Sequence, residues 1–73
     1  MNWKELIRDL RGRRHQADLA ADLDVSQTTV SLWERQGVVP RGNALIRLIN
    51  RYPERRDDIL AAISEAQAET TRA

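Results

Sequence analysis

Apolar residues recur at intervals of three and four along most of this chain, which is the period of helices with one buried face. The first such helix is predicted over residues 2–11, with Gly12 placed to adopt a left-handed conformation just after its last turn. Its apolar face carries Trp3, Leu6, Ile7 and Leu10.

Two shorter helices, residues 16–23 and 27–36, are predicted next, with a tight turn between them. Ser26 is placed to cap the second one, because serine side chains accept hydrogen bonds from the free N–H groups at a helix start. The apolar positions that define this pair are Leu19, Ala20, Leu23, Val25, Val30 and Trp33.

A fourth helix is predicted after Pro40 and Asn43, which we place in the loop before it. It ends at Tyr52, because Pro53 disfavours helical geometry in the residue that precedes it. Its core-facing stripe consists of Leu45, Leu48 and Ile49.

Pro53 suits the first position of a fifth helix, residues 53–68, where its missing N–H is not needed. The acidic residues Glu54, Asp57 and Asp58 lie near the positive end of this helix, and its apolar stripe consists of Ile59, Leu60, Ile63 and Ala66. Residues 69–73 are expected to fray. Since no segment alternates with period two, we expect one all-α domain of five helices, residues 1–68.

The composition restricts the class of protein. Seventy-three residues allow one small domain with a thin margin of stability, and the absence of cysteine excludes disulfides and thiolate metal sites. No apolar run is long enough to span a membrane, and charges interrupt the N-terminal segment where a signal peptide needs an apolar stretch. We therefore expect a soluble cytoplasmic protein with no membrane partner, cofactor, metal or small-molecule ligand.

The formal net charge of +1 conceals an uneven distribution. Residues 1–56 contain eleven Lys and Arg against seven Asp and Glu, about +4, whereas residues 57–73 contain Arg72 against four acidic residues, about −3. A basic body favours a polyanionic partner, from which the acidic C-terminal helix is expected to be kept away.

Ten residues form a recognisable set, because they combine ordered apolar spacings, a small alanine at the contact of two helices and a serine cap. They are Gln16, Leu19, Ala20, Leu23, Val25, Ser26, Val30, Trp33, Glu34 and Gly37. This set resembles the small helix-turn-helix domains of phage Cro proteins and repressors, the XRE-like family. With the flanking helices, the resemblance covers residues 2–63. It implies a five-helix lambda-repressor-like domain that binds double-stranded DNA through a helix-turn-helix at residues 16–36 and is therefore associated with the nucleoid.

With Val30 and Trp33 committed to the core, five residues remain on or beside the open face of the second short helix: Gln27, Thr28, Ser31, Leu32 and Arg35. In a helix-turn-helix, the N-terminal residues of the second helix meet base edges in the major groove. A glutamine amide pairs with adenine, a threonine hydroxyl donates or accepts, and a leucine packs on a thymine methyl. We expect Gln27 and Thr28 to matter most, then Ser31. The alternative is a solvated helix face.

Phosphate contacts are predicted around the same two helices. Gln16 begins the first of them, where free N–H groups and the positive helix end favour a phosphate oxygen. The resemblance implies that Gln16 also hydrogen-bonds Gln27. The other candidates flank the helices: Arg11, Arg13, Arg14, Arg41 and Asn43. Such contacts position a protein without reading sequence, and the alternative is an ordinary basic surface.

The chain departs from the family pattern at three places. Asp24 stands where the turn usually has glycine, so a left-handed aspartate is expected there at a steric cost. His15 is a poorer cap than the usual serine or threonine, and the segment 35–43 is longer than the common turn after the reading helix. Structural roles are expected for three residues: core positions for Trp3 and Trp33, and an ion pair with a nearby arginine for Glu34.

The fifth helix is predicted to join two copies of the chain through Leu60, Ile63 and Ala66. A two-fold dimer would match the two half-sites of a palindromic operator. The alternative is that this stripe packs entirely within the monomer.

The leading functional hypothesis is that the chain is a sequence-specific transcriptional regulator that represses a promoter. The resemblance to compact phage and mobile-element regulators implies that this is its own promoter. Two alternatives stay open: the antitoxin of a toxin–antitoxin pair, and a protein-interaction module that keeps the fold without binding DNA. An enzyme is not expected, because His15 is the only histidine and no phosphate loop or metal-ligand cluster occurs.

Overall fold

The computed structural model describes the backbone of residues 2–72 and the side chains of residues 2–68. All regular elements in this part of the chain are helical: α1 (Trp3–Arg11), α2 (Gln16–Leu23), α3 (Gln27–Gln36), α4 (Gly42–Arg51), the 3-10 helix η1 (Pro53–Arg55) and α5 (Arg56–Arg72). The predicted all-α class and the five α-helices are confirmed.

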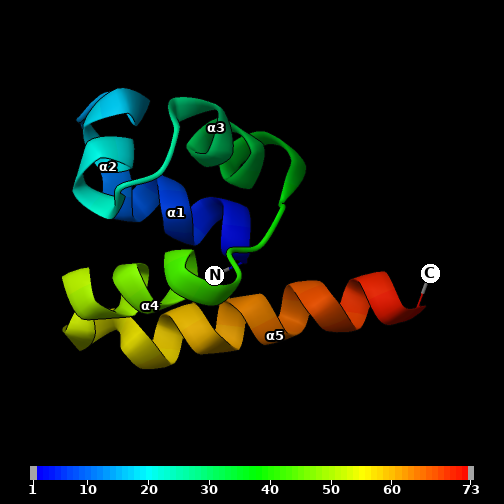
Figure 1. Cartoon of the computed structure of the whole chain (residues 1–73). Helices are drawn as coiled ribbons and strands as arrows, with labels where there is room; N and C mark the ends of the chain where they lie inside the picture. Colours follow the sequence, from blue (N-terminus) through cyan, green and yellow to red (C-terminus); the bar gives the residue numbers. More distant parts are fainter. Residues whose placement is uncertain (1, 73) are drawn as a thin grey trace.

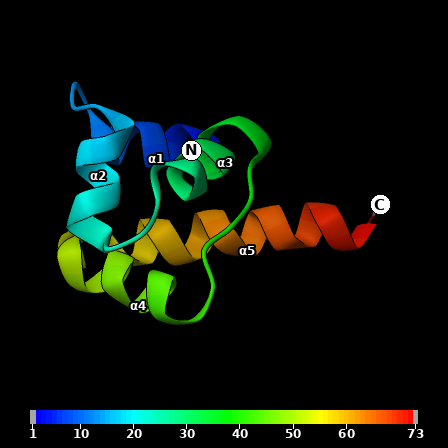
Figure 2. The same ribbon diagram turned by 45° about the horizontal axis from the view of Figure 1, so that its top comes forward.

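Helix α1 lies in the middle of the molecule (Figure 1). It packs on α3 on one side and on α5 on the other, while α2 contacts both α3 and α4. Both views place α4 next to the N-terminal half of α5, whose C-terminal half extends past the other helices (Figure 2). The α2–α3 pair therefore occupies the opposite side of the molecule from α5.

One hydrophobic core fills the space between the helices, and it consists of Trp3, Leu6, Ile7, Leu10, Leu19, Ala20, Leu23, Val30, Trp33, Leu48, Ile59, Ala62 and Ile63. Trp3 and Trp33 meet edge to face at its centre, with ring centroids 5.9 Å apart and ring planes at 65°. Such pairs contribute about 0.5–1.5 kcal/mol beyond the area they bury. The prediction that both tryptophans are core residues is confirmed.

Local sequence sets the ends of α1 and α3. Asn2 and Ser26 each accept a hydrogen bond on the side chain from the N–H group three residues ahead, at 2.9 and 3.1 Å. Gly12 and Gly37 follow the last turns with φ of 62° and 71°, a region that favours glycine because it has no Cβ. The predicted bounds of both helices hold to within a residue.

The beginnings of α4 and α5 differ slightly from prediction. The chain turns at Gly42, with φ of 55°, and α4 starts there, so Asn43 lies in the first turn of the helix instead of the preceding loop. Pro53 starts a helical segment as predicted, but its first turn is the 3-10 helix η1, and α5 begins at Arg56.

The end of α5 lies beyond the predicted one. The helix continues past Ala68 to Arg72, because neither glycine nor proline occurs in this segment to end it. The expected frayed tail is corrected for residues 69–72, and Ala73 lies outside the described residues.

Candidate nucleic-acid interface

Helix α3 has one buried and one exposed side. Val30, Trp33 and Glu34 are buried. The residues predicted to read bases lie on the other side, within an arc of ~140° at 100° per residue: Gln27, Thr28, Leu32 and Arg35 are exposed, and Ser31 is half-buried. Gln36 is also exposed at the edge of this face, as its helical position indicated, although the sequence analysis did not single it out.

The turn between α2 and α3 contains one left-handed residue. Asp24 has φ of 54° and ψ of 45°, as predicted. Its N–H donates to Ala21 O at 3.3 Å, and the Val25 N–H donates to Ala20 O at 3.0 Å, which completes the end of α2. Arg47 of α4 donates to the Asp24 carbonyl oxygen at 3.2 Å. The turn is therefore connected to α4 by a contact that no local pattern in the sequence indicated.

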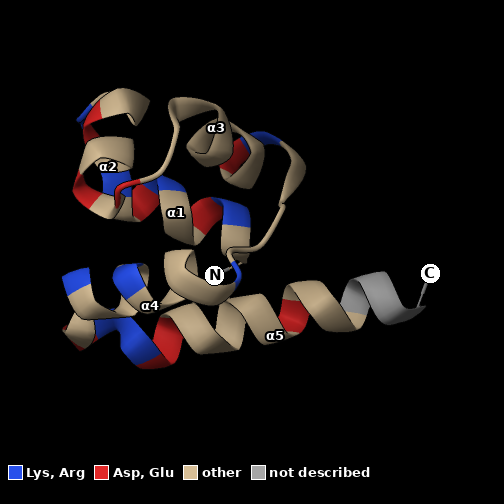
Figure 3. Ribbon diagram, viewed as in Figure 1, with Lys and Arg blue, Asp and Glu red and all other residues tan. Residues whose placement is uncertain are grey.

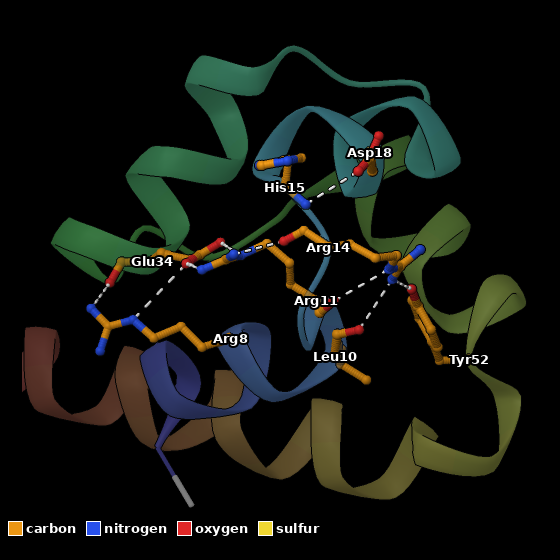
Figure 4. Close-up of polar contacts among 8 residues, drawn as sticks. All are labelled: Arg8, Leu10, Arg11, Arg14, His15, Asp18, Glu34 and Tyr52. Atoms are coloured by element: carbon orange, nitrogen blue, oxygen red, sulfur yellow. Dashed lines mark hydrogen bonds and ion pairs between the residues drawn. The ribbon is translucent and has the colours of Figure 1, made fainter.

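A buried carboxylate joins the back of α3 to α1 (Figure 4). Glu34 is 3% exposed and accepts hydrogen bonds from Arg11 Nε at 2.8 Å and Arg11 Nη2 at 2.9 Å. Arg8 Nη2 donates to the Glu34 carbonyl oxygen at 2.8 Å. The hydrogen bonds to Glu34 raise the pKa of Arg11, against a smaller opposing effect of burial. The predicted ion pair of Glu34 with an arginine of the first helix is confirmed.

The connection from α3 to α4, residues 37–41, is held against α1. The Val38 carbonyl oxygen accepts a hydrogen bond from Trp3 Nε1 at 2.7 Å, and Pro40 is buried. A Cβ at Gly37 would lie 3.1 Å from Lys4 Cε, so the chain approaches α1 closely here. This long connection is therefore fixed at its middle, and it leads to Arg41 at the start of α4.

The residues predicted to contact phosphates fall into two groups. Arg13, Arg41 and Asn43 are exposed, and none of their side chains makes a hydrogen bond or ion pair with another described residue. Gln16 is half-buried at the first position of α2, and no hydrogen bond joins it to Gln27 in the described structure. These side chains remain available to a partner.

Arg11 and Arg14 form the other group, because their guanidinium groups already have partners. Arg11 holds Glu34, and its Nη1 donates to the Arg14 carbonyl oxygen at 2.8 Å. The Arg14 guanidinium binds the side chains of Tyr52 and Asp22, and these hydrogen bonds raise its pKa. Tyr52 was predicted only as the end of the fourth helix, and its contact with Arg14 was not, since the two residues lie 38 positions apart in the chain.

Ion pairs engage half of the other arginines whose side chains are described, namely Arg8, Arg47, Arg51 and Arg55. Figure 3 shows where Lys and Arg and where Asp and Glu lie along the ribbon. Arg47 and Arg51 of α4 lie 3.6 Å from carboxylate oxygens of Asp24 and Asp22, and Arg55 pairs with Asp9 and Asp58. Among the residues whose side chains are described, the cations without an ion pair are Lys4, Arg13, Arg35, Arg41 and Arg56. Three of these flank or belong to the α2–α3 pair along the chain: Arg13 precedes α2, Arg35 lies in α3 and Arg41 follows α3.

Two of the three residues predicted to join two copies of the chain are covered within the monomer, and the predicted interface itself stays a prediction. Ile63 is 6% exposed and belongs to the core, and Ala66 is half-buried against it. Only Leu60, at 38% exposure, lies on the surface. Helical spacing alone leaves open how much of this stripe packs within the monomer, and only the packing of α5 on α1 shows which of its residues are covered.

Within the described residues, no helix has the length and apolar character needed to cross a bilayer. No three histidine, cysteine, aspartate or glutamate side chains of the described chain gather as metal ligands would.

Comparison of the chain with models of known families, with curated proteins and with solved structures finds no match. The assignment of a function therefore depends on the geometry described above and on the sequence pattern.

Proposed function

We propose that this chain binds double-stranded DNA sequence-specifically and regulates transcription, with α2 and α3 acting as a helix-turn-helix. The observation that supports this most directly is the exposed side of α3. Its N-terminal half presents Gln27 and Thr28 to solvent with Ser31 beside them, while Val30 and Trp33 hold the opposite side in the core. Amide and hydroxyl groups at the N-terminal end of such a helix read base edges in the major groove.

The distribution of charge also supports a DNA partner. Arg13, Arg35 and Arg41 flank or belong to the α2–α3 pair and have no intramolecular ion pair among the described residues. Unpaired cations beside a polar helix face suit phosphates on either side of a groove. The net charge of +1 is small because the chain has eleven Asp and Glu against twelve Lys and Arg, and several of these carboxylates pair with arginines elsewhere in the fold.

The attachment of α3 also fits a reading helix. The two-pronged contact between Arg11 and Glu34 and the burial of Trp33 fix the back of α3 on α1. Base contacts need side chains held within about 0.5 Å of a productive position, which a fixed helix provides better than a loop.

The test is selection of bound duplexes from a random library, followed by titration of the enriched duplex at several salt concentrations. We expect one enriched motif and an affinity that falls steeply between about 50 and 200 mM salt. No enrichment, or binding insensitive to salt, contradicts the proposal and favours a protein-interaction module.

Gln27→Ala tests whether α3 reads the bases. Loss of a base contact should weaken binding of the enriched duplex by about 5- to 150-fold, while binding of a random duplex stays unchanged. Gln36→Ala, an exposed glutamine at the other end of the same helix, is the matched control. Equal losses in both variants would show that the N-terminal half of α3 does not face the bases.

The proposal extends to a homodimer on a palindromic operator and to repression of the chain's own promoter, in keeping with the resemblance to phage repressors. The selected motif tests the symmetry directly: two inverted half-sites with centres about 10 base pairs apart indicate a dimer. A single half-site indicates that the chain binds as a monomer.

A further inference from the structure

Arg14 lies just before α2 and contacts α1, α2 and the end of α4. Figure 4 shows its contacts with Leu10 and Tyr52. Its guanidinium points back onto the end of α1, where Nη2 donates to Leu10 O at 3.1 Å and Nε donates to Arg11 O at 3.2 Å. Nη1 binds the Asp22 carboxylate in the last turn of α2. Nη2 also donates to the hydroxyl oxygen of Tyr52, the residue after α4, at 2.7 Å.

These contacts occupy most of the donors that Arg14 has. A guanidinium carries about five N–H groups, one on Nε and two on each terminal nitrogen. The four hydrogen bonds use the Nε donor, both donors of Nη2 and one donor of Nη1. One Nη1 donor remains, so a two-pronged contact with a phosphate would have to displace a partner within the protein, whereas the neighbouring Arg13 is exposed and makes no such bond in the described structure.

Tyr52 is a fixed end for this connection. Its ring is half-buried against the core, and the Arg51 guanidinium lies over it, 5.4 Å from the ring centroid. Since Gln16 follows Arg14 by two residues, the connection determines where the first turn of α2 lies relative to α1 and α4.

We propose that Arg14 and Tyr52, which we call the Arg14 clamp, are positioning residues that place the first turn of α2 for its contact with DNA. Arg14 acts through its partners in the protein and does not bind a phosphate. This inference rests on the proposed DNA-binding function, but its structural part can be measured without DNA.

The first experiment compares the salt dependence of binding to the enriched duplex for Arg14→Gln and Arg13→Gln. Each phosphate contact contributes about 0.9 to the slope of log K against log salt concentration. We expect Arg13→Gln to lower the slope by this amount and Arg14→Gln to weaken binding at an unchanged slope. A fall of about 0.9 for Arg14→Gln would show that Arg14 contacts a phosphate and would overturn the clamp.

Tyr52→Phe is the milder variant, because it removes one hydroxyl and no charge. We expect binding about fivefold weaker at an unchanged salt slope, the equivalent of one hydrogen bond. The double variant Arg14→Gln/Tyr52→Phe should lose little more than Arg14→Gln alone, because both changes break the same connection. Affinity equal to wild type in Tyr52→Phe contradicts the clamp. Thermal melts define a temperature at which every variant compared is folded. If Arg14→Gln does not fold, Tyr52→Phe alone decides whether the Arg14 clamp positions α2.

Amide hydrogen exchange tests the clamp on the free protein. The N–H groups of Asp18 and Leu19 donate to the His15 carbonyl oxygen in the first turn of α2. In Tyr52→Phe these two amides should exchange faster than in wild type, while the amides of α5 keep their rates. Unchanged exchange at Asp18 and Leu19 would overturn the clamp. If wild type itself fails to bind duplex DNA, the proposed function fails, and the exchange rates still decide whether Arg14 positions α2.

Discussion

The guanidinium of Arg11 meets both carboxylate oxygens of Glu34, at 2.8 and 2.9 Å, and so joins the end of α1 to the last turns of α3. The glutamate is 3% exposed, whereas the arginine side chain retains 26% of its exposed surface. A buried carboxylate in this position is stable only while its cation is present, because its charge has no access to water.

Glu34→Gln should lower the free energy of unfolding by about 2–3 kcal/mol, because it leaves the guanidinium of Arg11 without its anion; the loss is smaller than for a fully buried pair because Arg11 keeps part of its hydration. Urea unfolding measures the change. Glu65→Gln is the control, since Glu65 is exposed on α5, and its effect should stay below about 0.5 kcal/mol. Equal midpoints for the two variants would mean that the pair contributes nothing to stability.

Asp24→Gly should raise the free energy of unfolding by a few tenths to about 1 kcal/mol, because glycine adopts φ of 54° without steric cost. The backbone contact from Arg47 survives the change, and the side-chain ion pair that is lost is largely exposed and worth little. The measurement is again urea unfolding. Ala21→Gly, within α2, should have the opposite sign, about 0.5–1 kcal/mol less stable. A less stable Asp24→Gly would contradict the left-handed turn.

Ile63→Asp should destabilise the fold far more than Leu60→Asp. Placing a carboxylate at the core position should cost about 4 kcal/mol or more, a large share of the roughly 5–15 kcal/mol that stabilises a domain. Leu60 is on the surface, so its substitution should leave the thermal melt nearly unchanged. Similar melting temperatures would show that the burial of Ile63 is not as described.

Sedimentation of wild type and Leu60→Asp then decides whether Leu60 supports a dimer: a dimer that dissociates on substitution supports it, and monomers in both cases exclude it.

Arg35→Gln and Arg41→Gln should each lower the slope of log K against log salt concentration by about 0.9 in DNA binding. Arg35 lies on the exposed side of α3, Arg41 ends the connection that follows α3, and neither has an ion pair among the described residues. Arg56→Gln, at the start of α5 on the other side of the molecule, is the control and should leave the slope unchanged (Figure 1). A slope that depends equally on all three arginines would indicate a diffuse attraction instead of an oriented contact.

The elements of this fold were accessible from the sequence because their causes are local. The apolar spacing of α1, the Ser26 cap and the left-handed Asp24 each depend on residues within one or two helical turns. The exposed side of α3 followed for the same reason, once Val30 and Trp33 were assigned to the core. The predicted end of α5 was too early. The residues after Ala68 have no helix preference strong enough to extend the prediction, and none of them is a residue that ends a helix.

What the sequence determined by itself was the number, type and approximate bounds of the helices and the polar side of α3, since helical periodicity and capping act over a few residues. The tertiary structure alone decided which charged groups are available. Arg13 and Arg14 are adjacent and chemically identical, yet one is exposed and the other binds Asp22 and Tyr52, because the partners come from α2 and from the end of α4. The burial of Ile63 beside an exposed Leu60 has the same origin, since the packing of α5 on α1 covers one side of the helix and leaves the next open.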